Sequence, residues 1–435
     1  MIEADDYPLW NSPAMNAYLK TLSPSVMLTE GRGVRVRDSG GRWFLDARSG
    51  LWNVTLGYDH PAVREAIKRQ VDALPYANLI GYGRPAEIAV TAANALLPHL
   101  PPNLKKVRYC SNGSQANETA MLLSRFLHRA AGQPDRTAVF GMWRGFHGLG
   151  AAGGALTGLP YVHRQAGPLL PDVRHAPGPF EPMGDGSRSD LERTIEDYGP
   201  ERVAAVVVEP IVGEGGHVLG ADYLRSLAAF CRARGIHFVV DEVTTGMGRT
   251  GAFTRTGQLD VDSDILLLGK GLTSGYAPLA AVVLSDEIFA QLYDLPYTRQ
   301  FFIGSTNDGH PLALAASIAV IETLAKEGLL DNVTARGEQL HAGLLALSSR
   351  HPRITAVRGS GLMYAVELGH SDGKPVEEAA TNHLRLAMEA RGVLVSTLAL
   401  WPAIMIIPPL IIEPAEIDEI LLALDLALDD IAVLF

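Results

Sequence analysis

Cysteine is nearly absent from this sequence. The 435 residues include two cysteines, Cys110 and Cys231, which lie far apart and in no Cys-x-x-Cys spacing. Neither a disulfide framework nor a thiolate metal site can be built from such a pair. We therefore expect no bound metal, and we expect the protein to work in a reducing cytoplasm.

Long apolar runs and a secretion signal are also missing. The N-terminus opens with acidic residues and lacks the basic start and apolar run of a signal peptide. The longest apolar stretch, 398–412, is too short to span a bilayer and contains three prolines. The sequence therefore predicts a protein that is neither exported nor embedded in a membrane.

Positive charge is in deficit. Acidic residues outnumber basic ones by 48 to 37, which gives a net charge of −11. Such a charge repels a phosphate backbone, so nucleic acid is not an expected partner. The chain is 47% hydrophobic and exceeds the length at which one core keeps growing, so we expect two packed domains.

Apolar runs alternate with helical patterns in the middle of the chain. The runs cover residues 203–208, 237–240, 265–268 and 279–284, and an amphipathic segment covers 222–234. This alternation is typical of a buried, largely parallel sheet with crossover helices. The outer parts differ, with a hairpin pattern at 33–45, strand patterns at 362–367 and 393–396, and a leucine-rich helix from 417. We assign these outer parts to a smaller α+β domain.

Polar residues follow three of the apolar runs. Glu209 follows the first, Asp241 and Glu242 follow the second, and Lys270 follows the third after one glycine. Ligands of open α/β sheets bind beyond the carboxyl ends of the strands. Acids at strand ends also cap helices or meet solvent, and a lone lysine is usually solvated. Lys270, however, stands in GKGLTSGYAPL, whose small residues allow a rigid group to approach closely, and such a lysine can form an imine with an aldehyde.

A phosphate cradle is the second chemical signal. The strand-like run 107–110 is followed by SNGSQAN and a helical pattern over 118–131, which places Gly113 and Ser114 at a helix start. Free backbone N–H groups and the positive end of the helix dipole bind phosphate there, although Ser, Asn and Gly also cap helices without a ligand. A phosphate cradle, an acid and an imine-forming lysine together fit pyridoxal phosphate.

Four ordered motifs carry a resemblance to a known family. They are VVVEPIVGEGG at 206–216, HFVVDEVTTGMGRTGAF at 237–253, LLLGKGLTSGYAPLAAVV at 266–283 and GSTNDGHPLALAA at 304–316. In these segments the chain resembles the class III, or omega, aminotransferases of fold type I. The likeness continues through GLWNVTLGYDHPAVREAI (50–67), SNGSQANETA (111–120), WRGFHG (143–148), VRGSGLM (357–363) and PPLII (408–412), and so covers nearly the whole chain.

The resemblance implies an α/β architecture with a large domain and a small one. The large, cofactor-binding domain would hold a mostly parallel seven-stranded sheet flanked by helices and cover residues 61–320. Residues 321–435 would form the small α+β domain. The N-terminal segment 1–60 would add to the small domain and to dimer contacts.

The resemblance also assigns residues around the cofactor. Lys270 would bind pyridoxal phosphate covalently, and Asp241 would partner the pyridine nitrogen. Val243 would contact one face of the ring and Phe146 would stack on the other. Glu209 matches a family acid near the hydroxyl side of the cofactor and the substrate.

The phosphate end of the cofactor is assigned in the same way. Gly113 and Ser114 correspond to the phosphate-binding loop of the family. Thr306 corresponds to a threonine that reaches the same phosphate from the neighbouring subunit, so the resemblance implies a homodimer with shared active sites. We interpret His147, His310 and Arg249 as structural residues.

The C-terminal segment departs from the pattern of relatives that bind carboxylate substrates. Met405 stands where many of them place an arginine, and no Arg, Lys or His follows Arg391. Either this segment is a core strand and an arginine elsewhere takes the role, or the substrate is not an ordinary α-amino acid. In the second case Trp52 would line an apolar or aromatic subsite, and an omega-amine or an aminosugar would be the expected substrate type.

The implied activity moves an amino group from an amine or amino-acid donor to a ketone or aldehyde acceptor, with pyridoxamine phosphate as the intermediate form of the cofactor. The family also includes racemases or epimerases, aminomutases and phospho-lyases. Motifs alone do not separate these alternatives from an aminotransferase.

Overall fold

A computed structural model describes residues 27–80, 84–165, 167–180, 190–296, 299–370, 376, 378–398 and 401–431. Its largest sheet has seven strands in the order β4-β12-β11-β10-β7-β5-β6. Strand β12 pairs antiparallel with β11 and β4, whereas the pairs among β11, β10, β7, β5 and β6 are parallel. The strands are β4 (Leu104–Cys110), β5 (Ala138–Met142), β6 (Val173–Ala176), β7 (Val203–Val208), β10 (His237–Asp241), β11 (Ile265–Leu268) and β12 (Ala280–Ser285). The expected mostly parallel, seven-stranded sheet is confirmed.

Both faces of this sheet are buried, which explains its continuous apolar runs. In β11, Ile265 and Leu267 belong to the apolar cluster under α5 (Gly113–Ala130), and Leu266 and Leu268 belong to the cluster on the opposite face. Successive side chains of a strand point to opposite faces, so a strand covered on both sides has no polar positions. All four residues are fully buried.

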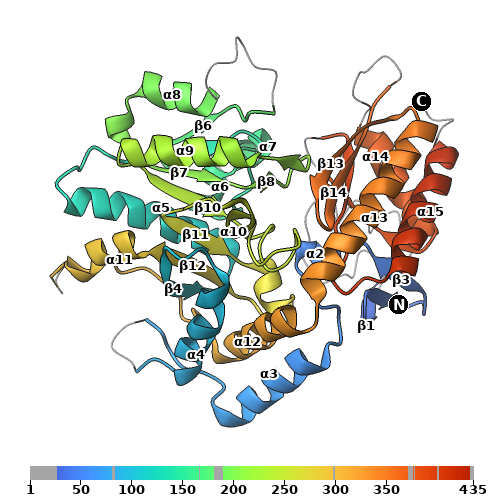
Figure 1. Cartoon of the computed structure of the whole chain (residues 1–435), viewed down its shortest axis with the longest axis horizontal. Helices are drawn as coiled ribbons and strands as arrows, with labels where there is room; N and C mark the ends of the chain where they lie inside the picture. Colours follow the sequence, from blue (N-terminus) through green and yellow to red (C-terminus); the bar gives the residue numbers. More distant parts are fainter. Residues whose placement is uncertain are drawn as a thin grey trace.

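Helices flank the sheet (Figure 1). Helix α5 packs on β7, β11 and β12, and α9 packs on β10. Helix α12 lies against α3 and α4 at one end of the sheet. The helices of this part are α3 (Pro61–Ala73), α4 (Glu87–Leu96), α6 (Ala151–Leu156), α7 (Pro160–Gln165), α8 (Asp190–Tyr198), α9 (Ala221–Ala233), α10 (Arg255–Leu259), α11 (Asp286–Tyr293) and α12 (Pro311–Lys326).

Two smaller sheets lie beside the large one (Figure 1). The N-terminal sheet contains β1 (Leu28–Arg32), β2 (Arg35–Asp38), β3 (Trp43–Asp46) and β15 (Val393–Leu394). The C-terminal sheet contains β13 (Ile354–Ser360), β14 (Met363–Leu368), β17 (Ala403–Ile406) and β16 (Ser396–Thr397). Helices α13 (Leu329–Arg350) and α14 (Glu378–Ala390) pack on the C-terminal sheet, and α15 (Pro414–Ile431) packs against both of these helices. The parallel pairing of β3 with β15 joins segments from the two ends of the chain.

Strand direction brings the chemical residues to one edge of the large sheet. Val208 of β7 pairs with Val240 of β10, and Asp241 pairs with Leu267 of β11. The carboxyl ends of these parallel strands therefore coincide, and the residues that follow them share one rim. Strand β4 also ends there, because Cys110 pairs with Ala280 next to the partner of Leu268. Helix α5 begins three residues later, so its N-terminus faces the same rim.

Candidate active site

A pocket of about 470 Å³ opens at this rim. Its lining includes Gly113, Ser114, Phe146, Asp241, Val243 and Lys270. The volume lies within the range of small-molecule sites. Of the residues that the sequence analysis assigned around a cofactor, only Glu209 and Thr306 are not in this lining.

Asp241 is a buried carboxylate with three hydrogen-bond donors. Its Oδ2 accepts from His147 Nδ1 and from Asn117 Nδ2, both at 2.8 Å, and its Oδ1 accepts from the Val243 backbone N–H at 3.0 Å. Burial alone would raise the pKa of Asp241, but the hydrogen bond and charge of His147, with the other two donors, hold it below its ordinary value. Asp241 is therefore ionised in the folded protein at neutral pH.

His147 is the partner that keeps this charge buried. It is 2% exposed, and its backbone N–H donates to Thr157 Oγ1 at 2.8 Å. Burial lowers the pKa of His147, but the hydrogen bond and charge of Asp241 outweigh burial and raise it. The two side chains form a buried hydrogen-bonded pair in the lining of the pocket.

Lys270 follows β11 in a strained backbone conformation. Its φ is +41°, in the left-handed region that non-glycine residues avoid. Its Nζ donates to Thr244 Oγ1 at 2.6 Å and lies 5.0 Å from the centre of the Trp52 ring. Burial lowers the pKa of Lys270, although the negative charges of Glu209 and Asp241 oppose this. Lys270 is thus a desolvated amine held at the rim, which is the state a nucleophilic lysine needs.

Glu209 is hydrogen-bonded to the backbone of Phe146. Its Oε1 accepts from the Phe146 backbone N–H at 2.9 Å and its Oε2 from the Gly213 N–H at 3.3 Å. Burial raises the pKa of Glu209 to about 7, with Asp241 adding to the shift and His147 and Lys270 opposing it. The carboxyl can therefore change its protonation state at neutral pH.

Glu242 has a different role from its neighbour. Its carboxylate accepts from the Thr256 N–H and hydroxyl, from the Arg255 N–H and from Thr245 Oγ1, at 2.6 to 3.0 Å. Arg255 and Thr256 are in the first turn of α10, and Thr245 is in the loop that precedes this helix. Of the two adjacent acids, Glu242 ties down a helix start, as acids at strand ends commonly do, and Asp241 lines the pocket.

The helix start at α5 leaves no room for larger residues. A Cβ on Gly148, whose φ is +121°, would lie 2.2 Å from Ser114 Oγ, and a Cβ on Gly113 would lie 3.1 Å from a Val243 methyl group. Asn112 caps the helix by accepting from the Gln115 N–H at 3.0 Å. The result is a cradle of backbone at a helix N-terminus, with a serine hydroxyl beside it, which suits a phosphate group.

Trp52 and Met405 belong to one apolar cluster. Met405 is fully buried in β17, and Trp52 packs against the cluster that contains it. The Trp52 Nε1 donates to Ser396 Oγ at 3.3 Å, and a Cβ on Gly213 would lie 2.9 Å from the indole. Met405 is thus a core residue of the C-terminal sheet, and of this pair Trp52 is the one that reaches Lys270.

Thr306, which was assigned to the phosphate, does not line the pocket. It is exposed and lies in the loop before α12, where its backbone carbonyl accepts from the Tyr76 hydroxyl at 2.9 Å. Within one chain, Thr306 makes no part of the cradle.

Comparison with known proteins agrees with this geometry. The family model for class III aminotransferases matches residues 18–428. The chain belongs to the class III aminotransferases. It is 31% identical to the putrescine–pyruvate aminotransferase of Pseudomonas aeruginosa, over 93% of this chain and 91% of that one. It is 32% identical to an omega-aminotransferase of Caulobacter vibrioides, over 90% and 91%. An amine transaminase of an uncultivated Pseudomonas species, solved with pyridoxal phosphate bound, has 30% identity and a TM-score of 0.89, with 98% of both chains covered.

This aminotransferase uses pyridoxal phosphate, and the fold is fold type I. The residues present fit the cofactor on two independent observations. A Cβ on Gly148 would clash with Ser114 in the cradle, and Asp241, which lines the pocket, has an Oδ1 that accepts from one backbone N–H. The relatives named above are aminotransferases, which favours amino transfer over the racemase, aminomutase and lyase alternatives.

Three contacting residues were missed by the sequence analysis. His147 was interpreted as structural, and Asn117 and Thr244 were given no role, yet all three touch Asp241 or Lys270. Asn117 falls one helical turn after Gly113, so its place on the inner face of α5 could have been found from spacing. His147 and Thr244 stand in loops, where no periodicity indicates direction.

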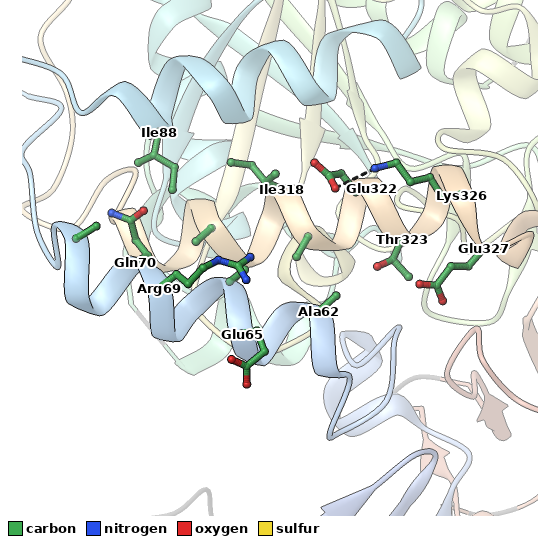
Figure 2. Close-up of a pocket in the computed structure, with 14 residues that line it drawn as sticks. Ala62, Glu65, Arg69, Gln70, Ile88, Ile318, Glu322, Thr323, Lys326 and Glu327 are labelled. Atoms are coloured by element: carbon green, nitrogen blue, oxygen red, sulfur yellow. Dashed lines mark hydrogen bonds and ion pairs between the residues drawn. The ribbon is translucent and has the colours of Figure 1, made fainter.

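A second hollow, of about 560 Å³, lies between α3, α4 and α12, away from the site (Figure 2). Alanines line its floor, and charged side chains such as the Glu322–Lys326 pair lie along its edge. None of the candidate active-site residues lines this second hollow. In the part of the chain that the structure describes, no cluster of His, Cys, Asp or Glu could hold a metal ion, and no helix is long and apolar enough to cross a membrane.

Proposed function

We propose that this aminotransferase takes its amino group from a primary amine whose carbon chain is apolar or extended, and gives it to a small carbonyl acceptor. The observation that carries the proposal is the position of Trp52, whose ring lies 5.0 Å from Lys270 Nζ. A substrate on that side meets an indole face backed by the apolar cluster of Met405. The relative from Pseudomonas aeruginosa is named for a diamine donor and pyruvate, which supports the same assignment.

Residue roles follow from the geometry of the site. When bound, pyridoxal phosphate supplies an aldehyde that takes up the amino group and a ring that accepts electrons. Lys270 would hold the cofactor covalently, and its free amine would take the proton from the substrate carbon that bears nitrogen. Asp241 would stabilise a positive charge on the ring nitrogen, and Phe146 and Val243 would contact the ring. Gly113 and Ser114 would hold the phosphate.

Glu209 stands at the substrate side of this arrangement. With a pKa of about 7 it is divided between a neutral acid and a carboxylate under working conditions. We infer that the Glu209 carboxyl is ionised when a cationic amine binds. We also infer that the same carboxyl is protonated when a substrate without positive charge binds. A single pocket can then admit the amine donor and the neutral carbonyl acceptor in turn.

We further propose a homodimer in which Thr306 reaches the phosphate site of the partner copy. Three large apolar side chains near these parts of the chain are exposed: Leu51 in the pocket lining (76%), Leu149 next to Gly148 (66%) and Phe302 in the loop of Thr306 (81%). Large exposed apolar side chains near a site indicate a covered surface. A second copy of this chain would cover them and supply the threonine that the pocket lacks.

The division into domains and the cellular location are proposals of the same kind. The pairing of β3 with β15 supports a small domain that contains both the N-terminal segment and residues 321–435, beside a large domain of 61–320. Of the proposed N-terminal segment 1–60, residues 1–26 lie outside the described part of the chain. Cys110 and Cys231 are both buried free thiols, which supports a cytoplasmic protein.

The test follows the absorbance of the purified holoenzyme as single donors are added without an acceptor. A diamine and a simple aromatic amine should convert the lysine-bound cofactor to its pyridoxamine form at least tenfold faster than glutamate does. Lys270→Ala should show no conversion and no covalent cofactor, and Lys106→Ala, at an exposed lysine on β4, should behave as wild type. Equal or faster conversion by glutamate would refute the donor assignment.

A further inference from the structure

Arg249 is a buried cation without a buried anion to match it. It is 1% exposed and heads the group of largest fully buried side chains. Burial is the one cause that shifts its pKa, to about 9, so no carboxylate in the described part of the chain compensates the charge. An uncompensated charge is costly inside a protein and is retained where it has a function.

The guanidinium of Arg249 binds two separate segments of the C-terminal sheet. Its Nη1 donates to the Leu362 carbonyl at 2.9 Å and to the Pro408 carbonyl at 2.5 Å. Leu362 lies in the turn between β13 and β14, and Pro408 follows β17. The Leu362 N–H in turn donates to the Arg249 carbonyl at 3.1 Å, so the side chain and the backbone of one residue hold the same turn.

The surrounding backbone is shaped for this contact. Gly361, with φ of +58°, turns so close that an added Cβ would lie 2.4 Å from the Arg249 carbonyl oxygen. Gly248, with φ of +93°, leaves no room for a Cβ against Leu410. Such close approaches on both sides fix the register between the loop after β10 and the C-terminal sheet.

The same loop belongs to the catalytic rim. Arg249 follows Asp241, Val243 and Thr244 along one continuous loop, and Met247 of this loop packs against Gly271, next to Lys270. The positive charge of Arg249 adds to the effect of burial in lowering the pKa of Lys270. The Nη2 of the Arg249 guanidinium is buried and has no hydrogen-bond partner among the described residues. Hydrogen bonds therefore satisfy only part of this charged group.

We propose that Arg249 is a positioning residue of the active site: it locks the C-terminal sheet onto the loop that runs from Asp241 through Thr244, and it holds a buried positive charge at the end of that loop. The inference rests on the proposed role of Lys270. It assigns a functional reason to a cation that a purely structural role would not require, since neutral donors can also bind carbonyl groups.

The test separates the positive charge of Arg249 from its hydrogen bonds to the Leu362 and Pro408 carbonyls. Arg249→Gln keeps a donor and removes the charge, and Arg249→Lys keeps the charge on a shorter side chain that does not bring its nitrogen to the place of Nη1, between the two carbonyls. Arg136→Gln is the matched control, because Arg136 is 8% exposed and also donates to backbone carbonyls, those of Glu201 at 3.2 Å and Arg234 at 2.6 Å. Arg136 lies at a separate hollow and does not contribute to the pKa of Lys270.

The first readout is the initial rate at which cofactor-free protein attaches added pyridoxal phosphate at Lys270, measured across pH. Borohydride reduction traps the product, and mass spectrometry counts the labelled peptide. The positive charge of Arg249 is one of the causes that lower the pKa of Lys270, so its removal should raise that pKa. The midpoint of the profile should therefore rise in Arg249→Gln and stay unchanged in Arg249→Lys and Arg136→Gln.

The second readout is the split between KM and kcat for an amine donor. Loosening the C-terminal sheet beside Trp52 should raise KM in Arg249→Lys about fivefold and change kcat less. An unchanged midpoint in a folded Arg249→Gln, or an unchanged KM in Arg249→Lys, overturns the proposal. The KM result decides alone if the glutamine variant does not fold. If wild-type Lys270 takes no label, with Lys270→Ala as the blank, the proposed role of Lys270 fails instead.

Discussion

Glu209 offers a prediction whose size can be worked from the structure. Its pKa in the folded protein is about 7, against an ordinary value of 4.5, because burial disfavours the charged form. Each tenfold change in proton affinity corresponds to about 1.4 kcal/mol, so the ionised carboxyl destabilises the fold by about 3 kcal/mol above pH 7. A raised acidic pKa means that stability is lost as pH rises from 4.5 to 7 and is fully present below 4.5.

Glu209→Gln should remove this pH-dependent cost. Its amide keeps an acceptor for the Phe146 N–H but places a donor against the Gly213 N–H, which costs about 1 kcal/mol. The variant should therefore be more stable than wild type by about 2 kcal/mol at pH 8.5 and by about 0 kcal/mol at pH 5. Denaturant unfolding of the two proteins at both pH values measures the difference.

Glu242→Gln is the matched control. Glu242 is also fully buried with a raised pKa, but its carboxylate accepts four hydrogen bonds from Thr256, Arg255 and Thr245. An amide leaves some of these donors unsatisfied, so this variant should lose about 2 kcal/mol at pH 8.5. The reasoning is refuted if Glu209→Gln destabilises the protein at pH 8.5, or if its effect is the same at pH 5.

Three further outcomes are expected. Trp52→Gly should raise kcat/KM for bulky amines about tenfold relative to small ones, because the indole occupies the space beside Lys270; equal ratios in steady-state assays would count against that placement. Gly148→Ala places a Cβ 2.2 Å from Ser114 Oγ at φ of +121°, so it should destabilise the cradle by at least about 2 kcal/mol and raise the Kd of pyridoxal phosphate, measured by fluorescence titration. Burial against His128 lowers the pKa of His237 to about 3, so this histidine contributes stability above pH 6.5 that is lost as pH falls toward 3. His237→Phe should remove about 2 kcal/mol of the stability difference between pH 7.5 and pH 5, and a variant whose pH dependence matches wild type would contradict the assignment.

Much of the central sheet is determined by the sequence alone. The runs 203–208 and 265–268 coincide with β7 and β11 to the residue, because strands covered on both faces have uninterrupted apolar sequences. Chain direction then places Glu209, Asp241 and Lys270 at one rim. Local chemistry was enough for these residues, since a strand end and a glycine-rich turn leave few alternative positions.

The sequence placed Gly113 and Ser114 at a helix start, as the structure has them, although apolar periodicity marks only the later part of that helix. Its apolar periodicity was recognised from 118, whereas α5 begins at Gly113. The first turn of a helix buries few side chains, so periodicity does not mark it. The capping asparagine, Asn112, was the available signal.

Contacts between distant loops were decided by the tertiary structure. Asp241 and His147 are 94 residues apart, and the ion pair between them exists because β10 and the loop after β5 end on the same rim. Arg249 meets Leu362 across 113 residues for a similar reason. The sequence shows periodicity within a helix or strand, but it does not show directly which loops contact one another.

Met405 and Trp52 illustrate the same division. The sequence showed that no basic residue follows Arg391, and this fact excluded a charged carboxylate clamp on the C-terminal wall. Only the tertiary structure showed that Met405 of β17 is a core residue of the C-terminal sheet and that the Trp52 ring lies near Lys270. Residue types set the chemistry available to this aminotransferase, and the close packing of side chains from distant segments decided which of them face the reacting atoms.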